Sequence, residues 1–213
     1  MRKSGFTLIE VMIAITVFAI GVLAVLRLLT SNLVMMDKTQ NRTIATFLAK
    51  EGIEMVYNMR DANIEKGLPW NCLLTNTINL DLYGQGDADK ACERYFSSGA
   101  NGGDVLSLGF SNSGYFFAEH KPIEINFSEN FKNFALVQKT MKVGEKDISR
   151  YTPGQSDETG GLQIFGRYVV FKAVKDGANA LPLDSVLKVE SHVLFSKGAS
   201  TGEIVLESLI GKK

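Results

Sequence analysis

Groups that carry enzyme chemistry are scarce in this sequence. Only two histidines, His120 and His192, and two cysteines, Cys72 and Cys92, occur among its 213 residues. They leave few ligands for a transition metal and few bases for nucleophilic catalysis. The sequence also has no Gly-x-Ser-x-Gly, no phosphate-binding loop and no His-Glu-x-x-His, the motifs that place such groups in many enzymes. We therefore expect no catalytic site, no cofactor and no metal centre.

An excess of charge of either sign is also lacking. Lys plus Arg and Asp plus Glu number 23 each, so the formal net charge is zero. Proteins that bind nucleic acid usually show a basic patch or stripe, and none is visible here. Direct binding of nucleic acid is therefore not supported. Hydrophobic residues make up 45% and charged residues 22% of the chain, which is ordinary usage for a folded protein.

Contiguous apolar sequence is concentrated in the first 36 residues. The 21 residues from Phe6 to Leu26 are interrupted only by Thr7, Glu10 and Thr16, and about 20 apolar residues suffice for a membrane-spanning helix. Arg2 and Lys3 precede this tract. Basic residues on a short flank favour the cytoplasmic side, so we expect the N terminus in the cytoplasm and the remainder outside it.

Three interpretations compete for this segment. A secretory signal peptide would be cut at a small-x-small site beyond its apolar core, and residues 27–37 contain no good site of that kind. A plain membrane anchor explains the length and the basic flank but not Glu10, because an unpartnered carboxylate near an apolar helix end costs on the order of 1–3 kcal/mol. In the third interpretation the segment is a signal for processing and assembly, and each of these features has a use.

The stretch Lys3-Ser4-Gly5-Phe6-Thr7-Leu8-Ile9-Glu10 resembles the class III signal of type IV prepilins and type II secretion pseudopilins. The resemblance implies that a prepilin peptidase cuts between Gly5 and Phe6 and that Phe6 is then N-methylated. It also implies that Glu10 guides assembly with other pilin or pseudopilin subunits through an inner-membrane platform. Glycine at the cut lets an extended backbone fit closely into a protease. An unpaired carboxylate is costly in an apolar bundle, so pairing Glu10 with a neighbour's Phe6 amine would select one stagger between subunits.

The helix is expected to continue well past the membrane, over residues 6–60, with 6–26 as the membrane and assembly part. Proline is absent before Pro69, and glycine is confined to Gly21 and Gly52 across 6–60. At 1.5 Å per residue, this helix would be about 80 Å long. Two shorter helices with a break near Ser31-Asn32 or Asp37 are the alternative. Apolar residues at helical spacing predict that one side of the second half packs on a β domain; they are Ile44, Ala45, Leu48, Ala49, Gly52, Ile53, Val56 and Met59.

A second resemblance lies at the end of this helix. Ala49-Lys50-Glu51-Gly52-Ile53-Glu54 and Asn58-Met59-Arg60-Asp61 look like the helix end of PilV-like minor pilins. Many major pilins carry a proline that loosens the helix where this sequence has Arg27. Local melting of the helix is therefore in doubt, and we expect Arg27 to reach the outer headgroups with its long side chain.

Residues 61–104 are rich in Asn, Asp, Gly and Ser, which predicts an irregular loop region. Cys72 and Cys92 lie there, in a part of the chain expected to face an oxidising space. A disulfide between them would contribute about 3 kcal/mol by the chain-entropy model. Two reduced thiols, one of them buried, are the alternative.

A β-rich head is expected over residues 105–213. Short apolar or alternating runs between turns predict strands at 105–110, 114–119, 123–127, 135–143, 161–175, 185–196 and 203–210. In the last two, Leu187, Val189, Val193, Phe195, Ile204, Leu206 and Ile210 fall on one face, opposite Lys188, Glu190, His192, Glu203 and Glu207. This pattern predicts antiparallel strands with one face packed on the helix and the other wet, joined by a hairpin turn at 197–202.

The expected fold class is thus α+β and pilin-like, with a leader at 1–5, a long N-terminal helix and an antiparallel sheet head. The expected function is that of a minor pilin in a type IV pilus-like filament. It would be a single-pass membrane protein before assembly and part of an extracellular or periplasmic filament afterwards. A pseudopilin of a secretion or DNA-uptake system, and a membrane-anchored binding domain that never polymerises, are the alternatives.

Overall fold

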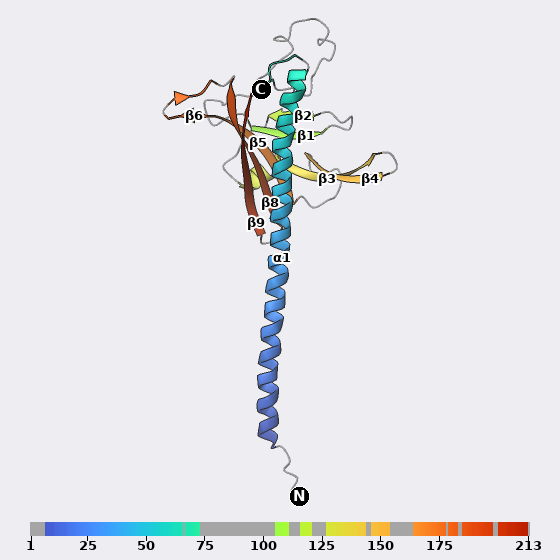
Figure 1. Ribbon diagram of the computed structural model, residues 1–213. Coiled ribbons are helices and arrows are strands. Elements are labelled where there is room, and N and C mark those ends of the chain that lie inside the picture. Colours follow the sequence, from blue (N-terminus) through green and yellow to red (C-terminus); the bar gives the residue numbers. More distant parts are fainter. Residues whose placement is uncertain are drawn as a thin grey trace. The chain divides into compact units, whose positions relative to one another are not determined.

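The computed structural model (Figure 1) describes residues 7–65, 67–72, 105–110, 116–120, 127–143, 146–153, 164–177, 179–182, 185–197 and 200–212. The chain divides into two compact units, which are residues 1–41 and residues 42–213. Helix α1 (Leu8–Glu65) contributes to both. The first unit contains the apolar part of α1, and the second contains its later turns together with the sheet.

α1 begins and ends at residues whose chemistry suits a helix terminus. Thr7 stands just before it and Glu10 lies in its first turn. At the other end, Gly67 has a φ of 72°. Its N–H bonds to the Ile64 carbonyl and the Leu68 N–H to the Asn63 carbonyl, at 3.1 and 2.9 Å. This pair of bonds is the Schellman arrangement, in which glycine takes the left-handed position without strain.

α1 is one helix, without the break that the alternative placed near Ser31-Asn32 or Asp37. It also continues five residues past the expected end at Arg60, so residues 61–65 of the expected loop region are helical. Residues 73–104 of that region lie outside the described part of the chain.

The head contains an antiparallel sheet of seven strands, in which β5 (Phe165–Ala173) is central. One edge of β5 pairs with β8 (Val186–Lys197), and β8 pairs with β9 (Ser200–Gly211). The other edge is shared: Phe165 and Gly166 pair with β3 (Ala135–Val143), whereas Val169 and Val170 pair with β1 (Val105–Phe110). On this side, β1 pairs in turn with β2 (Phe116–His120), and β3 pairs with β4 (Lys146–Pro153). A small separate ribbon is formed by β6 (Lys175–Asp176) and β7 (Asn179–Ala180).

One face of the sheet packs on the second half of α1, as predicted. Buried residues of this interface come from α1, β1, β3, β5, β8, β9 and the loop after α1; they include Ala45, Leu48, Ala49, Met55, Val56, Met59, Trp70, Leu106, Leu108, Leu136, Phe165, Val169, Phe171, Leu187, Val189, Val193, Phe195 and Ile210. Burying a side chain of this size contributes roughly 1.5–3 kcal/mol, so this interface is the core of the head.

The buried side chain of Arg167 links α1 to the sheet through hydrogen bonds. Its guanidinium donates to the Leu48 carbonyl at 3.1 Å, to the Glu51 carboxylate at 2.8 Å and to the Leu108 carbonyl at 3.0 Å. Gly52 lies beside it, and a Cβ there would collide with the Ser191 hydroxyl. Glycine fits this point because the helix backbone comes so close to the sheet that a Cβ would displace the Ser191 side chain.

The opposite face, here called the outer face, is not simply wet. Helix α3 (Phe127–Asn133) begins at the last residue of the expected strand 123–127, whose other residues lie outside the described part. Its Phe131 and the following Phe134 pack on the outer face, against a cluster that includes Tyr168, Val170 and Leu194. Two further expectations need correction: β4 lies in a stretch for which no strand was predicted, and the hairpin turn between β8 and β9 is tighter than 197–202, since Lys197 already pairs with Ser200.

Candidate functional site

The expected processing site lies at the start of the chain. Residues 1–6, which include Gly5 and Phe6, are outside the described part, so cleavage and N-methylation stay predictions. Glu10, the third residue of the expected site, is described and lies in the first turn of α1.

Thr7 and Glu10 form the acidic half of a capping box at the start of α1, because the Glu10 side chain bonds back to the Thr7 N–H while the Glu10 N–H bonds to the Thr7 carbonyl. The Glu10 carboxylate accepts hydrogen bonds from both the Thr7 N–H and the Thr7 hydroxyl, each at 2.9 Å, through the same oxygen, Oε2. The Thr7 carbonyl in turn accepts bonds from the N–H groups of Glu10 and Val11, at 3.1 and 3.3 Å. A carboxylate here satisfies an orphan donor and complements the positive end of the helix dipole. The Thr-x-x-Glu spacing that produces this box is visible in the sequence.

From Leu8 to Met36, the apolar side chains of α1 are exposed. Each large apolar side chain in this stretch is at least 42% exposed, and Met36 is 71% exposed. Among the described residues, α1 is the one helix long and apolar enough to cross a membrane. Water does not favour such a surface, so lipid or another apolar helix has to cover it.

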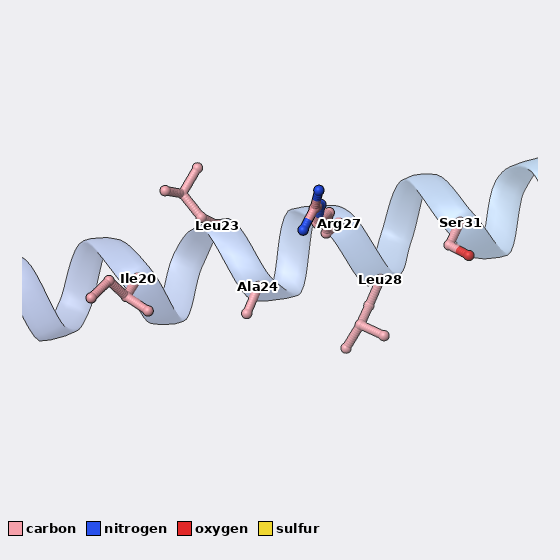
Figure 2. A pocket seen from close by; sticks show the side chains of 6 residues that line it. All are labelled: Ile20, Leu23, Ala24, Arg27, Leu28 and Ser31. Carbon is pink, nitrogen blue, oxygen red and sulfur yellow. The ribbon is translucent and has the colours of Figure 1, made fainter.

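Arg27 is the first cation after the apolar tract, and it lies in a shallow pocket on one face of α1. The pocket is lined by Ile20, Leu23, Ala24, Arg27, Leu28 and Ser31. Figure 2 shows these side chains on successive turns, with the short ones of Ala24 and Ser31 on either side of Arg27 along the helix. Because these two are small, another chain can approach the backbone there.

Cys72 is fully buried and disulfide-bonded. Its carbonyl accepts a hydrogen bond from the buried Asn63 side chain of α1 at 2.8 Å, and the same amide donates to the Trp70 carbonyl at 3.2 Å. The expected partner, Cys92, lies outside the described residues, so the pairing stays a prediction.

A charged network occupies part of the outer face. The buried Glu190 carboxylate lies 2.6 Å from the amines of Lys172 and Lys188 and 3.2 Å from His192 Nε2. Burial raises the pKa of Glu190, but hydrogen bonds from Lys172, Lys188 and His192 outweigh it and lower the pKa to about 2. The sequence placed Glu190 on the polar face but could not show that the group is buried and doubly paired. Glu207 also pairs with Lys188 at 3.3 Å, and Glu203 with His192 at 2.7 Å, so the group is a structural ion-pair cluster.

Among the described residues, no group of three or more His, Cys, Asp or Glu side chains could hold a metal ion. The long apolar helix packed on an antiparallel sheet is a pilin-like α+β fold. Glu10 caps the start of this helix, whose exposed apolar surface is long enough to cross a membrane.

Comparison with known proteins agrees with this description at the N terminus. Residues 1–26 match a family model described as the prokaryotic N-terminal methylation motif. No curated protein and no solved structure matches the chain. The match covers the first 26 of the 213 residues, and the helix and sheet that the structure describes form a pilin-like fold.

Proposed function

We propose that this protein is a structural subunit, a minor pilin, of a type IV pilus-like filament. Prepilin peptidase cuts it between Gly5 and Phe6 and the new N terminus is methylated. The mature helix then leaves the membrane and packs among the helices of other pilin subunits on an inner-membrane platform.

The observation that carries this proposal is the carboxylate of Glu10 at the start of an exposed apolar helix. A single-span anchor needs no charge there, and the charge is penalised in lipid. The capping box uses only Oε2 of this carboxylate. A carboxylate has two oxygens and can accept several donors, so Oε1 is available for the Phe6 amine of a neighbouring subunit.

Two further features support a minor pilin, the first over a pseudopilin and the second over a major pilin. The helix-end segments 49–54 and 58–61 resemble those of PilV-like minor pilins, and Arg27 stands where many major pilins have a helix-loosening proline. α1 is accordingly unbroken at Arg27. The basic residues Arg2 and Lys3 favour a cytoplasmic N terminus, which would leave the head, with its disulfide-bonded Cys72, on an oxidising side of the membrane.

Mass spectrometry of the N-terminal peptide tests the processing step. A mature chain that starts at methylated Phe6 is expected, and an intact Met1–Gly5 leader on the membrane-extracted protein would contradict the proposal. The intact leader is also what a non-polymerising anchored domain predicts.

A Glu10→Ala variant tests assembly separately from processing. We expect normal cleavage but loss of the protein from sheared filaments. Glu54→Ala is the matched control, because Glu54 is an exposed carboxylate on the same helix that pairs with Lys50 at 3.6 Å. Equal amounts of Glu10→Ala and wild-type protein in filaments would contradict the assigned role. If the protein is found with a secretion complex and not with surface pili, the pseudopilin alternative takes precedence.

A further inference from the structure

Arg27 divides the exposed apolar surface of α1 into two parts. The 19 residues Leu8–Leu26 that precede it span about 28 Å at 1.5 Å per residue, close to the roughly 30 Å hydrocarbon core of a bilayer. A guanidinium at the bilayer centre costs about 2.5–3.5 kcal/mol. The charge therefore sets the outer limit of the membrane-spanning part.

A second apolar stretch follows Arg27 and lies outside the hydrocarbon core. Its large side chains are Leu28, Leu29, Leu33, Val34, Met35 and Met36, and each is more than half exposed. With Leu8–Leu26 in the core, these side chains stand in the headgroup layer or beyond. An exposed apolar surface of this kind marks an interaction site.

One register between two parallel helices of this type would give a partner both to the Arg27 charge and to the second apolar stretch. Glu10 and Arg27 are 17 residues apart, which is about 26 Å along the helix. If the helix of a neighbouring subunit is displaced outward along the shared axis by this distance of about 26 Å, the carboxylate at its Glu10 position lies level with Arg27. The neighbour's next nine residues, Val11–Ala19, then come level with Leu28–Met36, so the register that pairs the charges also pairs the apolar stretches.

Polar side chains within these two stretches do not oppose this register. Thr16 bonds to the Met12 and Ile13 carbonyls, and Thr30 to the Leu26 and Arg27 carbonyls. Their hydroxyl donors are satisfied within their own helix, so packing against a second helix leaves no unmet donor on them.

We propose that the pocket around Arg27 receives the N-terminal end of a neighbouring subunit's helix, and that the guanidinium pairs with the acidic residue at the neighbour's Glu10 position. Ile20, Leu23 and Leu28 give the pocket apolar walls, whereas Ala24 and Ser31 allow close approach. Arginine can bind a carboxylate through two parallel N–H groups. The inference rests on the proposed function, because it needs a neighbour in a filament, and it adds a contact outside the motif of residues 1–10.

This contact is compatible with pairing between Glu10 and a Phe6 amine. That second pairing needs a stagger of only four residues, about 6 Å. Glu10 and Arg27 lie about 100° apart around the helix at 3.6 residues per turn, so they face different neighbours of a bundle. An uncleaved leader would place Arg2 and Lys3 of the neighbour level with Ala19 and Ile20, against apolar surface, so this register also requires leader removal.

Site-specific cross-linking in the full chain tests the contact without removing the charge. A photoreactive amino acid replaces Ser31, one turn beyond Arg27 on the same face, in cells that produce the filament. The control position is Leu29, about 160° around the helix from Ser31. In sheared filaments we expect position 31 to cross-link to the first three turns of another subunit's helix, with at least tenfold more product than position 29. Products with lipid alone, or with a segment elsewhere in a neighbour, would overturn the proposal.

Charge variants provide the second readout. Arg27→Leu leaves a neighbour's carboxylate without a partner in an apolar bundle, so its level in filaments should fall at least about tenfold, with normal cleavage at Gly5. Arg27→Lys keeps the charge and should retain more protein in filaments than Arg27→Leu. Wild-type levels of Arg27→Leu would refute this contact alone. Absence of the unmodified chain from filaments would instead refute the proposed function.

Discussion

Glu190 makes the stability of the head depend on pH in a direction that can be worked out from its contacts. Its side chain is 5% exposed and lies 2.6 Å from both Lys172 and Lys188. The pKa of about 2 in the folded head compares with an ordinary value of 4.5. By linkage, a difference of this size corresponds to about 3 kcal/mol of stability.

The sign follows from the direction of the pKa change. Because the folded pKa is depressed, the stabilisation is fully present above about pH 4.5 and is lost as the pH falls through about 2. Glu190→Gln removes the buried carboxylate that lies between Lys172 and Lys188, at all pH values. We therefore expect the free energy of unfolding to fall by about 3 kcal/mol at pH 7, with the two proteins converging as the pH approaches 2.

Denaturant unfolding of the full chain in detergent micelles measures this difference. Trp70, the single tryptophan, lies in the head core at 5% exposure and reports the transition. The control is Glu54→Gln, whose carboxylate is 61% exposed beside Lys50, and surface pairs of this kind contribute about 0–1 kcal/mol. A difference between Glu190→Gln and the wild type that stays the same from pH 7 to pH 2 would refute the reasoning.

Three further predictions concern the attachment of α1 and of the loop after it. Arg167→Ala should destabilise the head by about 3–5 kcal/mol in the same unfolding assay, since it leaves buried acceptors unpaired, and Arg167→Met, which refills the space, should cost less. Gly52→Ala should cost about 1–3 kcal/mol through overpacking against Ser191, and an unchanged melting temperature would contradict the close approach seen there. Cys72→Ser should cost about 3 kcal/mol; equal thiol labelling of the wild-type chain with and without reductant would show that Cys72 and Cys92 are not bonded.

Much of the fold could be predicted because its signals are local. The helical stripe from Ile44 to Met59 identified the face of α1 that is buried, and the alternation in β8 and β9 assigned each side chain to its sheet face. Both patterns repeat at the period of the element that forms them, so a single sequence reveals them. The continuity of α1 was also favoured by the lack of proline before Pro69.

Other elements were missed for equally physical reasons. Strand β4 has a mixed polar sequence whose partner, β3, specifies it through pairing along its whole length. Helix α3 was not predicted, because only its first residue, Phe127, lies in an expected element and its packing on the outer face is not visible in the sequence. Short segments of this kind are decided by tertiary packing and not by their own propensity.

The sequence by itself determined the N-terminal segment of this protein, up to Arg27. The Thr-x-x-Glu box, the apolar tract and the charge at Arg27 are contiguous, so their spacing along one helix follows from the order of residues alone. Only the tertiary structure decided that Arg167 reaches across to Leu48 and Glu51, that Gly52 meets Ser191, and that Glu190 is buried between Lys172 and Lys188. These contacts join residues up to 139 positions apart, and which of them meet depends on strand order and register, which no local pattern specifies.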